Sequence, residues 1–373
     1  MSRPKPCLFW LDMSRGCFYL RCESDEWAFI EDLQRPLPFD AAVISDRYLA
    51  DYPEGHVRFG EPRDRLATAL DRQGVRWSVD PDTARLEQQG SGKRQRPRAA
   101  NRPLARAIPL PLSAQRLAGQ DAIDALVEAD VRHQLGSRAF AAPYLEVATL
   151  DDPRLAVNLR LLARSRELAG DRALIAYLQI TRRHLLDGSA SGVAERLAGA
   201  GADVIFVRVR RFEPEAATPE EVLAYAAVIE AGTRAGVRMV ADCVGRLGAV
   251  LVATGADGFA TNAWRFHKVS ADLHPAGGGG AVGELLWEVP GAALGLAASA
   301  ATSVFCEVEG CPAPDGPGGD HLATRIHNLH EFQRTARLAA AEGLAYAARL
   351  AASTSPIVRG WAQALQQLAR RAA

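Results

Sequence analysis

The sequence predicts an α/β fold, a (β/α)8 barrel of the TIM type, with a helical segment after it. Short apolar runs alternate with helical patterns over residues 40–310, which is typical of parallel strands joined by crossover helices. Seven of these runs are clear strands, and that number favours a single barrel over an open sheet. No G-x-G-x-x-G run follows the first strand, so the usual dinucleotide signature of an open doubly wound sheet is missing.

Composition sets broad limits on function. The chain has 373 residues, 48% apolar and 24% charged, which suits a large core under an ordinary solvated surface. Basic and acidic residues balance at 44 each, so only a local basic patch would attract nucleic acid. No apolar run is long enough to span a bilayer and no signal peptide begins the chain, so we expect a soluble cytoplasmic protein without a membrane partner. Six cysteines in a chain of this length do not indicate a disulfide framework.

The chain divides into three predicted regions. Residues 1–39 alternate apolar and aromatic positions around a turn at 14–16, which predicts an N-terminal β hairpin extension before the barrel. The barrel itself is expected at 40–310, and an Ala- and Arg-rich helical region at 311–373. Within the barrel, residues 88–107 are rich in Gly, Pro and basic side chains, which predicts a mobile loop. That loop is either a solvated insertion or an arm that contacts phosphate.

The individual elements follow from local signals. The predicted strands are 40–49, 75–80, 139–147, 173–181, 203–211, 238–243 and 255–262, with the eighth at either 285–289 or 302–308. Predicted helices between them include 62–73, 113–135, 152–169, 189–200, 218–236 and 247–254. Ser113 is a candidate cap for the second of these helices. Thr218, followed by Pro219 and two glutamates, is a strong helix start.

Polar residues stand at the carboxyl ends of several predicted strands. They are Asp80, Glu146, Gln179, Asp242 and Asn262. In barrels this edge is where chemistry is done, so these residues are candidates for catalysis or substrate binding. The alternative is that they seal the barrel mouth or accept hydrogen bonds from loop amides.

Two further candidates follow the last clear strand. Arg265 and His267, next to Trp264, could hold a phosphate and stack on a base. The alternative for this segment is a packed loop without a role in binding.

Several motifs resemble the tRNA-guanine transglycosylase superfamily, including its DNA-modifying deazaguanine relatives. HNLHEFQR (327–334) resembles the run that closes the zinc site of that family, and Cys306 and Cys311 have the first-to-third spacing of its cysteine cluster. Upstream, ALIAYLQ resembles the strand that ends in a base-reading Gln, GADGFATN falls on the nucleophile strand, and WSVDPDT falls where the Asp-Ser-Gly-Gly-Phe loop begins. The resemblance runs from about residue 40 to 345 and depends on the order of these motifs.

The resemblance implies a base-exchange enzyme acting on guanine or 7-deazaguanine in tRNA or DNA. Such an enzyme attacks the sugar with a carboxylate and manages protons with a second acid or base. Asp80 and Asp242 would be the catalytic carboxylates, and Gln179 would read the base. A structural zinc ion would be held by three residues of the motif and a fourth ligand, since closure needs four. Those ligands are Cys306, Cys311 and His327, with His321 or Asp320 as the fourth. No organic cofactor is implied.

The sequence also departs from that family. Ala260 stands at the position of the nucleophilic aspartate, and Asp242 lies one strand away as a substitute. Residues 207–209, Val-Arg-Val, replace a Gly-Gly-Leu turn, and their side chains would crowd a bound base. Two other hypotheses therefore stay open. One is a catalytically silent barrel that binds nucleic acid or a partner subunit as a homo- or hetero-oligomer, and the other is an unrelated barrel enzyme acting on a small metabolite.

Overall fold

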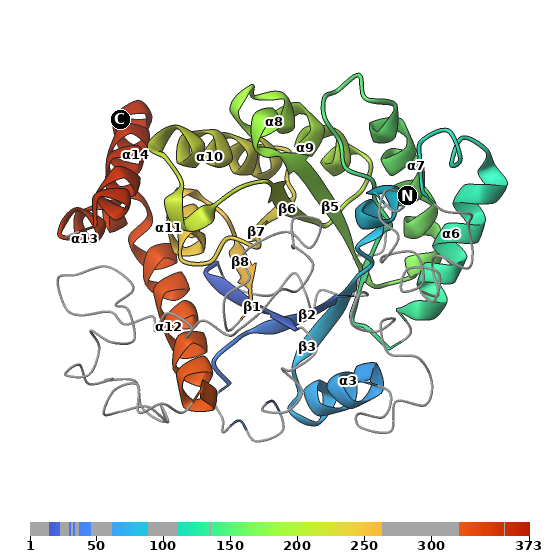
Figure 1. Cartoon of the computed structure of the whole chain (residues 1–373), viewed down its shortest axis with the longest axis horizontal. Coiled ribbons are helices and arrows are strands. Elements are labelled where there is room, and N and C mark those ends of the chain that lie inside the picture. The colour runs from blue at the N-terminus through green and yellow to red at the C-terminus, as the bar shows by residue number, and fades with distance from the viewer. Residues whose placement is uncertain are drawn as a thin grey trace.

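The protein is a (β/α)8 barrel, as the sequence predicts. The computed structural model describes residues 15–22, 30, 33, 37–45, 62–88, 111–134, 136–262, 321–353 and 355–373. Eight parallel strands form one sheet that curls into a nearly closed ring, and helices lie around its outside (Figure 1). Because all strand pairs are parallel, the carboxyl ends of the strands share one edge of the barrel.

The strands follow chain order around the ring. They are β1 (Cys17–Cys22), β2 (Ala41–Ser45), β3 (Arg76–Asp80), β4 (Ala139–Ala141), β5 (Ala173–Thr181), β6 (Val204–Arg210), β7 (Arg238–Asp242) and β8 (Gly258–Thr261). Hydrogen-bonded neighbours run β3-β2-β1-β8-β7-β6-β5-β4. Where β3 meets β4, the N–H of Arg138 donates to the carbonyl oxygen of Trp77 at 3.2 Å. The gap in the ring is therefore bridged at this point.

The N-terminal segment differs from the predicted hairpin. Cys17–Cys22 is a barrel strand, paired in parallel with β2 on one side and with β8 on the other. It supplies the eighth strand, so the barrel begins inside the region assigned to an extension. The predicted eighth strands at 285–289 and 302–308 lie outside the described residues. The alternation in CFYLRC suits a hairpin strand as well as a barrel strand, and only its distant partners distinguish the two.

Two helices begin at side-chain caps, and the sequence predicts the one at Thr218. Asp152 precedes α7 (Pro153–Ala169) and accepts the N–H of Arg154 at 2.9 Å. Thr218 and Glu221 form a capping box at α10 (Pro219–Arg234). The other helices between strands are α3 (Pro62–Arg72), η2 (Thr83–Gln88), α6 (Gln120–His133), α8 (Arg182–Leu186), α9 (Ser189–Gly199), η3 (Pro214–Ala216) and α11 (Leu247–Thr254).

Helix α6 begins later than predicted. Ser113 accepts the N–H of Arg116 within an exposed turn, so its side chain caps that turn and not the long helix. Gly119 precedes α6 with an extended backbone (φ −76°, ψ 151°). Glycine is unfavourable in a helix interior, and the helix begins just after it. The predicted helix at 113–135 is therefore shortened to 120–133.

Two apolar cores lie against the sheet, and a third, smaller one joins η2, α6 and α7 through Leu86, Ile123 and Leu161. One lies inside the barrel and includes Tyr19, Tyr177, Phe206, Val240 and Ala260, all almost fully buried. The other lies between the strands and the outer helices. This is the alternation expected of strands with both faces buried. The inner core ends at the carboxyl edge, where polar side chains replace apolar ones.

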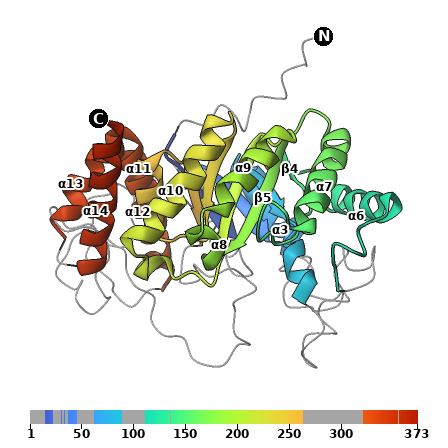
Figure 2. The same cartoon turned by 90° about the horizontal axis from the view of Figure 1, so that it is seen from above.

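The C-terminal helices cover one side of the barrel. Helix α12 (His321–Glu342) packs on β1 and α11, and α14 (Pro356–Ala372) packs on α10 and α11; the short η5 (Gly343–Tyr346) and α13 (Ala347–Ala351) join them. Phe332 of α12 contacts Phe18 and Phe259 with ring centroids 5.3 and 5.8 Å apart. In both views α13 and α14 lie at one end of the molecule and α6 at the other (Figure 1, Figure 2). Within the described ranges, no helix combines the length and the apolar character needed to cross a membrane.

Candidate functional site

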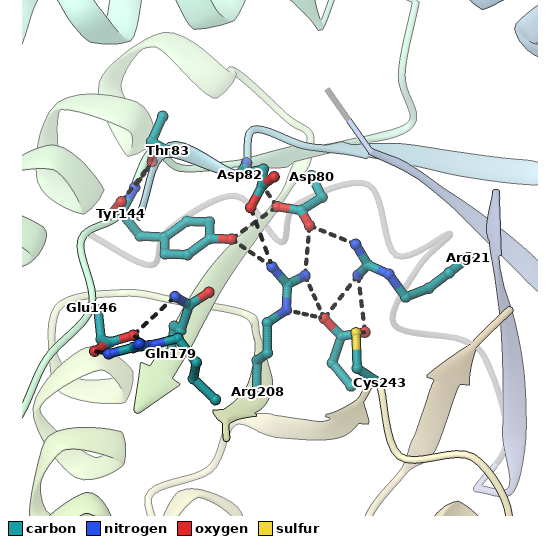
Figure 3. A network of polar contacts seen from close by, with 11 residues as sticks. Arg21, Asp80, Asp82, Thr83, Tyr144, Glu146, Gln179, Arg208 and Cys243 are labelled. Atoms are coloured by element: carbon teal, nitrogen blue, oxygen red, sulfur yellow. Dashed lines mark hydrogen bonds and ion pairs between the residues drawn. The ribbon is translucent and has the colours of Figure 1, made fainter. Parts of the chain in front are cut away.

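Polar side chains from five strands meet at the carboxyl edge of the barrel. Arg21 comes from β1, Asp80 from β3, Gln179 from β5, Arg208 from β6 and Asp242 from β7. Gln179, Arg208 and Asp242 are register partners on consecutive strands, so their side chains stand at one level. Figure 3 shows the labelled members of this group facing one another from opposite sides of the mouth.

Two arginines and two aspartates form the inner network of the mouth. Arg208 donates from Nη2 to Asp80 Oδ2 at 2.5 Å and to Asp242 Oδ2 at 2.6 Å, and its Nε donates to the same Asp242 oxygen at 2.9 Å. Arg21 donates from Nη2 to Asp80 at 2.7 Å and from Nη1 to both oxygens of Asp242 at 2.8 and 2.9 Å. Each arginine therefore bridges both acids (Figure 3). We use the name inner network for these four residues together with Tyr144.

Tyr144 completes the network from the loop after β4. Its hydroxyl donates to Asp80 Oδ1 at 3.1 Å and accepts from Arg208 Nη1 at 2.8 Å. The N–H of Asp82 also donates to Asp80 Oδ1 at 2.9 Å. Asp80 thus accepts four hydrogen bonds, which uses about the full capacity of a carboxylate. A carboxylate in this state has no free lone pair with which to attack a sugar or take a proton.

Burial strengthens the charge–charge interactions within this network. The side chains of Asp80 and Asp242 are 0% exposed and that of Arg208 is 1% exposed, whereas Arg21 retains 12%. Burial alone raises the pKa of Asp80, but Arg208 and Arg21 outweigh it and hold that pKa well below its usual range. Asp80 is therefore an anion at every physiological pH and cannot serve as a general acid.

The floor beneath the network is aromatic. The guanidinium of Arg208 lies 4.9 Å from the ring centroid of Tyr177, and Tyr177 stacks on Tyr144 at 4.9 Å. A cation over a ring face in a desolvated site is stabilising by about 2 kcal/mol or more. The ring contacts fix the plane of the guanidinium, so its donors keep a constant direction.

Three non-glycine residues with left-handed backbones follow strands at this same edge. Asp82 (φ 44°) lies just after β3, Arg211 (φ 57°) after β6 and Cys243 (φ 60°) after β7. Within the described ranges these are the non-glycine residues with positive φ. Such conformations cost about 1 to 3 kcal/mol each and cluster at functional sites. At Asp82 the turn lets the backbone N–H fold back onto Asp80.

A second group, which we call the rim cluster, surrounds the mouth on the β4–β6 side. Glu146, which follows β4, is held by both Nε and Nη2 of Arg210, the latter at 2.6 Å. Glu146 also accepts from Gln179 Nε2 at 3.2 Å. Its backbone N–H donates to Glu87 of η2 at 2.8 Å. Arg154 of α7 contacts Glu87 at 3.1 Å and Asp152 at 3.5 Å. The rim cluster therefore consists of Glu87, Glu146, Asp152, Arg154, Gln179 and Arg210.

Gln179 has one unused polar atom. Its residue is 1% exposed, and Oε1 finds no hydrogen-bond partner among the residues that the structure describes. The amide orientation follows from chemistry, because the carboxylate of Glu146 can only accept and must face the NH2 group. Oε1 consequently points away from Glu146, toward the side of the mouth where Arg208 lies (Figure 3). An unpaired buried acceptor costs about 1 to 3 kcal/mol, which a ligand donor would recover.

The structure brings together four of the residues predicted from sequence. Asp80 and Asp242 lie in the inner network, and Glu146 and Gln179 in the rim cluster. Asn262 is buried just after β8. Ala260 faces the barrel interior and is the register partner of Asp242, so the substitute acid is directly beside the position it would replace.

The other predicted residues are not gathered at the mouth. Arg265, His267, Cys306 and Cys311 lie outside the described residues. His327 is buried on α12, and His321 begins that helix. Within the part of the chain that the structure describes, no three His, Cys, Asp or Glu side chains are placed to hold a metal ion. The zinc site remains a prediction from the resemblance.

The sequence analysis missed four residues that organise the site. These are Arg21, Glu87, Tyr144 and Arg208. A signal existed for the arginines, since a charged residue inside an apolar strand, as in CFYLRC and VIFVRVR, needs a buried partner. The comparison of 207–209 with a glycine turn predicts side chains at this position but gives Arg208 no role in the site. Glu87 gave no such signal because it lies in the short helix η2, outside every strand and helix that the sequence predicts.

Comparison with known proteins identifies no family for this chain. No family model matches the chain, and no curated protein matches it. Among solved structures, a psychrophilic glycoside hydrolase family 10 endo-β-1,4-xylanase is similar over 66% of this chain and 86% of its own, with 10% identity and a TM-score of 0.35. Nitroalkane oxidase from Streptomyces ansochromogenes covers 95% of this chain and 97% of its own at 14% identity, with a TM-score of 0.32. Likenesses this weak carry no activity over to this protein.

Proposed function

We propose that the barrel mouth binds a guanine-type base, either free or within tRNA or DNA. The observation that carries this proposal is the buried, unpaired Oε1 of Gln179, which points away from Glu146 on the side of the mouth where Arg208 lies. Guanine and 7-deazaguanine present N–H donors along one edge, and one of these donors can pair with this acceptor. The sequence resemblance independently aligns Gln179 with a base-reading glutamine.

The inner network supports binding more than catalysis by its own acids. Every oxygen of Asp80 and Asp242 already accepts a hydrogen bond. Arg21 and Arg208 pair with Asp80 and Asp242, and Arg208 also lies 3.9 Å from the buried Asp82, so the charged groups on the floor of the mouth have partners and are preorganised. A neutral heterocycle can lie over such a floor without an unpaired charge. We therefore assign the acids to positioning Arg21 and Arg208.

Base exchange is the second candidate, and one observation favours it. Asp242 Oδ1 accepts from Arg21 and from the thiol of Cys243 at 3.6 Å, and Arg21 is the partly exposed member of the inner network. If Arg21 turned toward a substrate phosphate, this oxygen would keep only the thiol of Cys243 as a donor. Asp242 would then stand in for the missing nucleophile.

Equilibrium dialysis with labelled guanine and labelled 7-deazaguanine tests the binding proposal. We expect saturable binding, and we expect Gln179→Ala to weaken it at least about tenfold because a paired acceptor is lost. The exposed Gln115 provides a matched control, since Gln115→Ala removes the same group away from the mouth. Adenine lacks the N1–H of guanine and is expected to bind weakly. Equal binding by wild type and Gln179→Ala would contradict the proposal.

The same labelled bases separate binding from exchange. Incubation with tRNA or with DNA, followed by precipitation of the polymer, measures covalent incorporation. Binding without incorporation favours the silent barrel. Incorporation that is lost in Asp242→Asn favours base exchange, and incorporation that survives this substitution would exclude Asp242 as the nucleophile.

A further inference from the structure

The rim cluster contains more acid than base. Three carboxyl groups, those of Glu87, Glu146 and Asp152, face the two guanidinium groups of Arg154 and Arg210. The acidic side chains are 8 to 15% exposed, so water screens them poorly. Like charges that share a poorly solvated site cannot all remain ionised without cost. A bound proton relieves that excess.

Glu87 is the member least able to keep its charge. Glu146 is bound by both donors of Arg210, and Asp152 caps α7, where the helix dipole favours an anion. Glu87 has Arg154 as its cation, and Arg154 also contacts Asp152 and is 42% exposed. Among the residues that the structure describes, the groups facing Glu87 are thus Glu146 from the loop after β4, and Asp152 and Arg154 from the start of α7.

Glu87 also holds a structural connection to Gln179. Glu87 Oε2 accepts the backbone N–H of Glu146, and the side chain of Glu146 accepts from Gln179. A second connection between the same two segments lies four residues earlier. There the hydroxyl of Thr83 donates to the carbonyl oxygen of Tyr144 at 2.6 Å and accepts the N–H of Tyr144 at 2.7 Å. The segment after β3 therefore holds the loop after β4 by hydrogen bonds at two residues. At Thr83 the bonding group is a neutral hydroxyl, and at Glu87 it is a titratable carboxyl.

We infer that Glu87 is a proton-binding positioning residue of the mouth: it takes up the proton that three carboxyls facing two arginines require, and it holds Glu146 beside Gln179. Its role in positioning rests on the proposed function of Gln179, whereas its proton binding does not. Burial, together with the nearby Glu146 and Asp152, outweighs Arg154 and the Glu146 N–H and raises the pKa of Glu87 to about 7. The mouth consequently gains a negative charge as the pH rises through neutrality.

Carbon-13 NMR of the ligand-free full chain, labelled at glutamate Cδ, tests this inference without any base present. From about pH 4 to about pH 9 we expect one carboxyl resonance with a midpoint near 7, against about 4.3 for an ordinary glutamate. That resonance disappears in Glu87→Gln and persists in Glu220→Gln, a matched change at an exposed glutamate. The backbone amide of Glu146 should titrate with the same midpoint in the wild type and lose that transition in Glu87→Gln.

A second variant covers the case in which Glu87→Gln fails to fold. Arg154 lowers the pKa of Glu87, so Arg154→Gln should move the midpoint upward, and this side chain, which is 42% exposed, is expected to tolerate the change. Absence of any glutamate transition between about pH 6 and about pH 8 would overturn the inference. So would a Glu146 amide that does not follow the titration. Failure of guanine binding leaves these measurements unaffected, so the two proposals fail separately.

Discussion

Arg208 lies on the barrel interior with 1% of its side chain exposed, and it donates to two carboxylates and a tyrosine hydroxyl. A buried pair is weak evidence for stability, because desolvation offsets much of the attraction. Removing one partner is different, since the remaining charges stay buried without compensation. The network is therefore sensitive to the loss of any single member.

Arg208→Met should destabilise the protein by about 3 to 5 kcal/mol at neutral pH, because Asp80 and Asp242 would face each other as buried anions with Arg21 alone between them. Urea unfolding measures this loss. The loss should shrink as the pH falls, because protonation removes the uncompensated charge. Arg234→Met is the control, since Arg234 is 65% exposed, and its effect should stay within about 0.5 kcal/mol. A similar small effect for Arg208→Met would show that the network is not as buried as described.

Sequence alone could place the acids but not their partners. Asp80, Glu146, Gln179 and Asp242 were identifiable because each stands at or near the carboxyl end of a strand. The pairing of each arginine with an acid depends on strand order around the ring and on strand register. Neither can be predicted from the neighbouring residues in the sequence. These partners change the expected chemistry, because an aspartate that accepts hydrogen bonds from two arginines is a poor nucleophile.

Strand β1 shows how an element can be recognised and yet assigned to the wrong place. Its alternating pattern was evident, and its pairing with β8, more than 230 residues away in sequence, was not. Pairing of this kind is long-range and gives no short-range signal. By contrast, α7 and α10 were placed correctly, because caps and first-turn prolines are local features.

Closure of the barrel at β1 depends on a glycine in β8. A Cβ at Gly258 would lie 2.4 Å from the carbonyl oxygen of Cys17, which is backbone and cannot turn aside. Gly258→Ala should therefore destabilise the protein by about 2 kcal/mol or more, as forced overpacking does. Gly199→Ala in α9 is the matched control, because nothing lies within 4 Å of its Cβ position, and it should stabilise by up to about 1 kcal/mol. Thermal unfolding compares the two, and equal midpoints would argue against the tight β1–β8 contact.

At the scale of the whole molecule, one edge of the barrel collects its unusual features. The buried ion pairs, the left-handed residues after β3, β6 and β7, and the unpaired Gln179 oxygen all lie there. The barrel elsewhere is filled by apolar and aromatic side chains. Such a division between a stable body and a strained, polar mouth is typical of barrels that bind ligands at the carboxyl edge.

A crystal structure of the wild type grown with 7-deazaguanine tests the central claim most directly. The account predicts the base in the mouth, with a ring N–H within about 3 Å of Gln179 Oε1 and the inner network unchanged beneath it. A base bound elsewhere, or a mouth that remains free of base at saturating concentration, would contradict it.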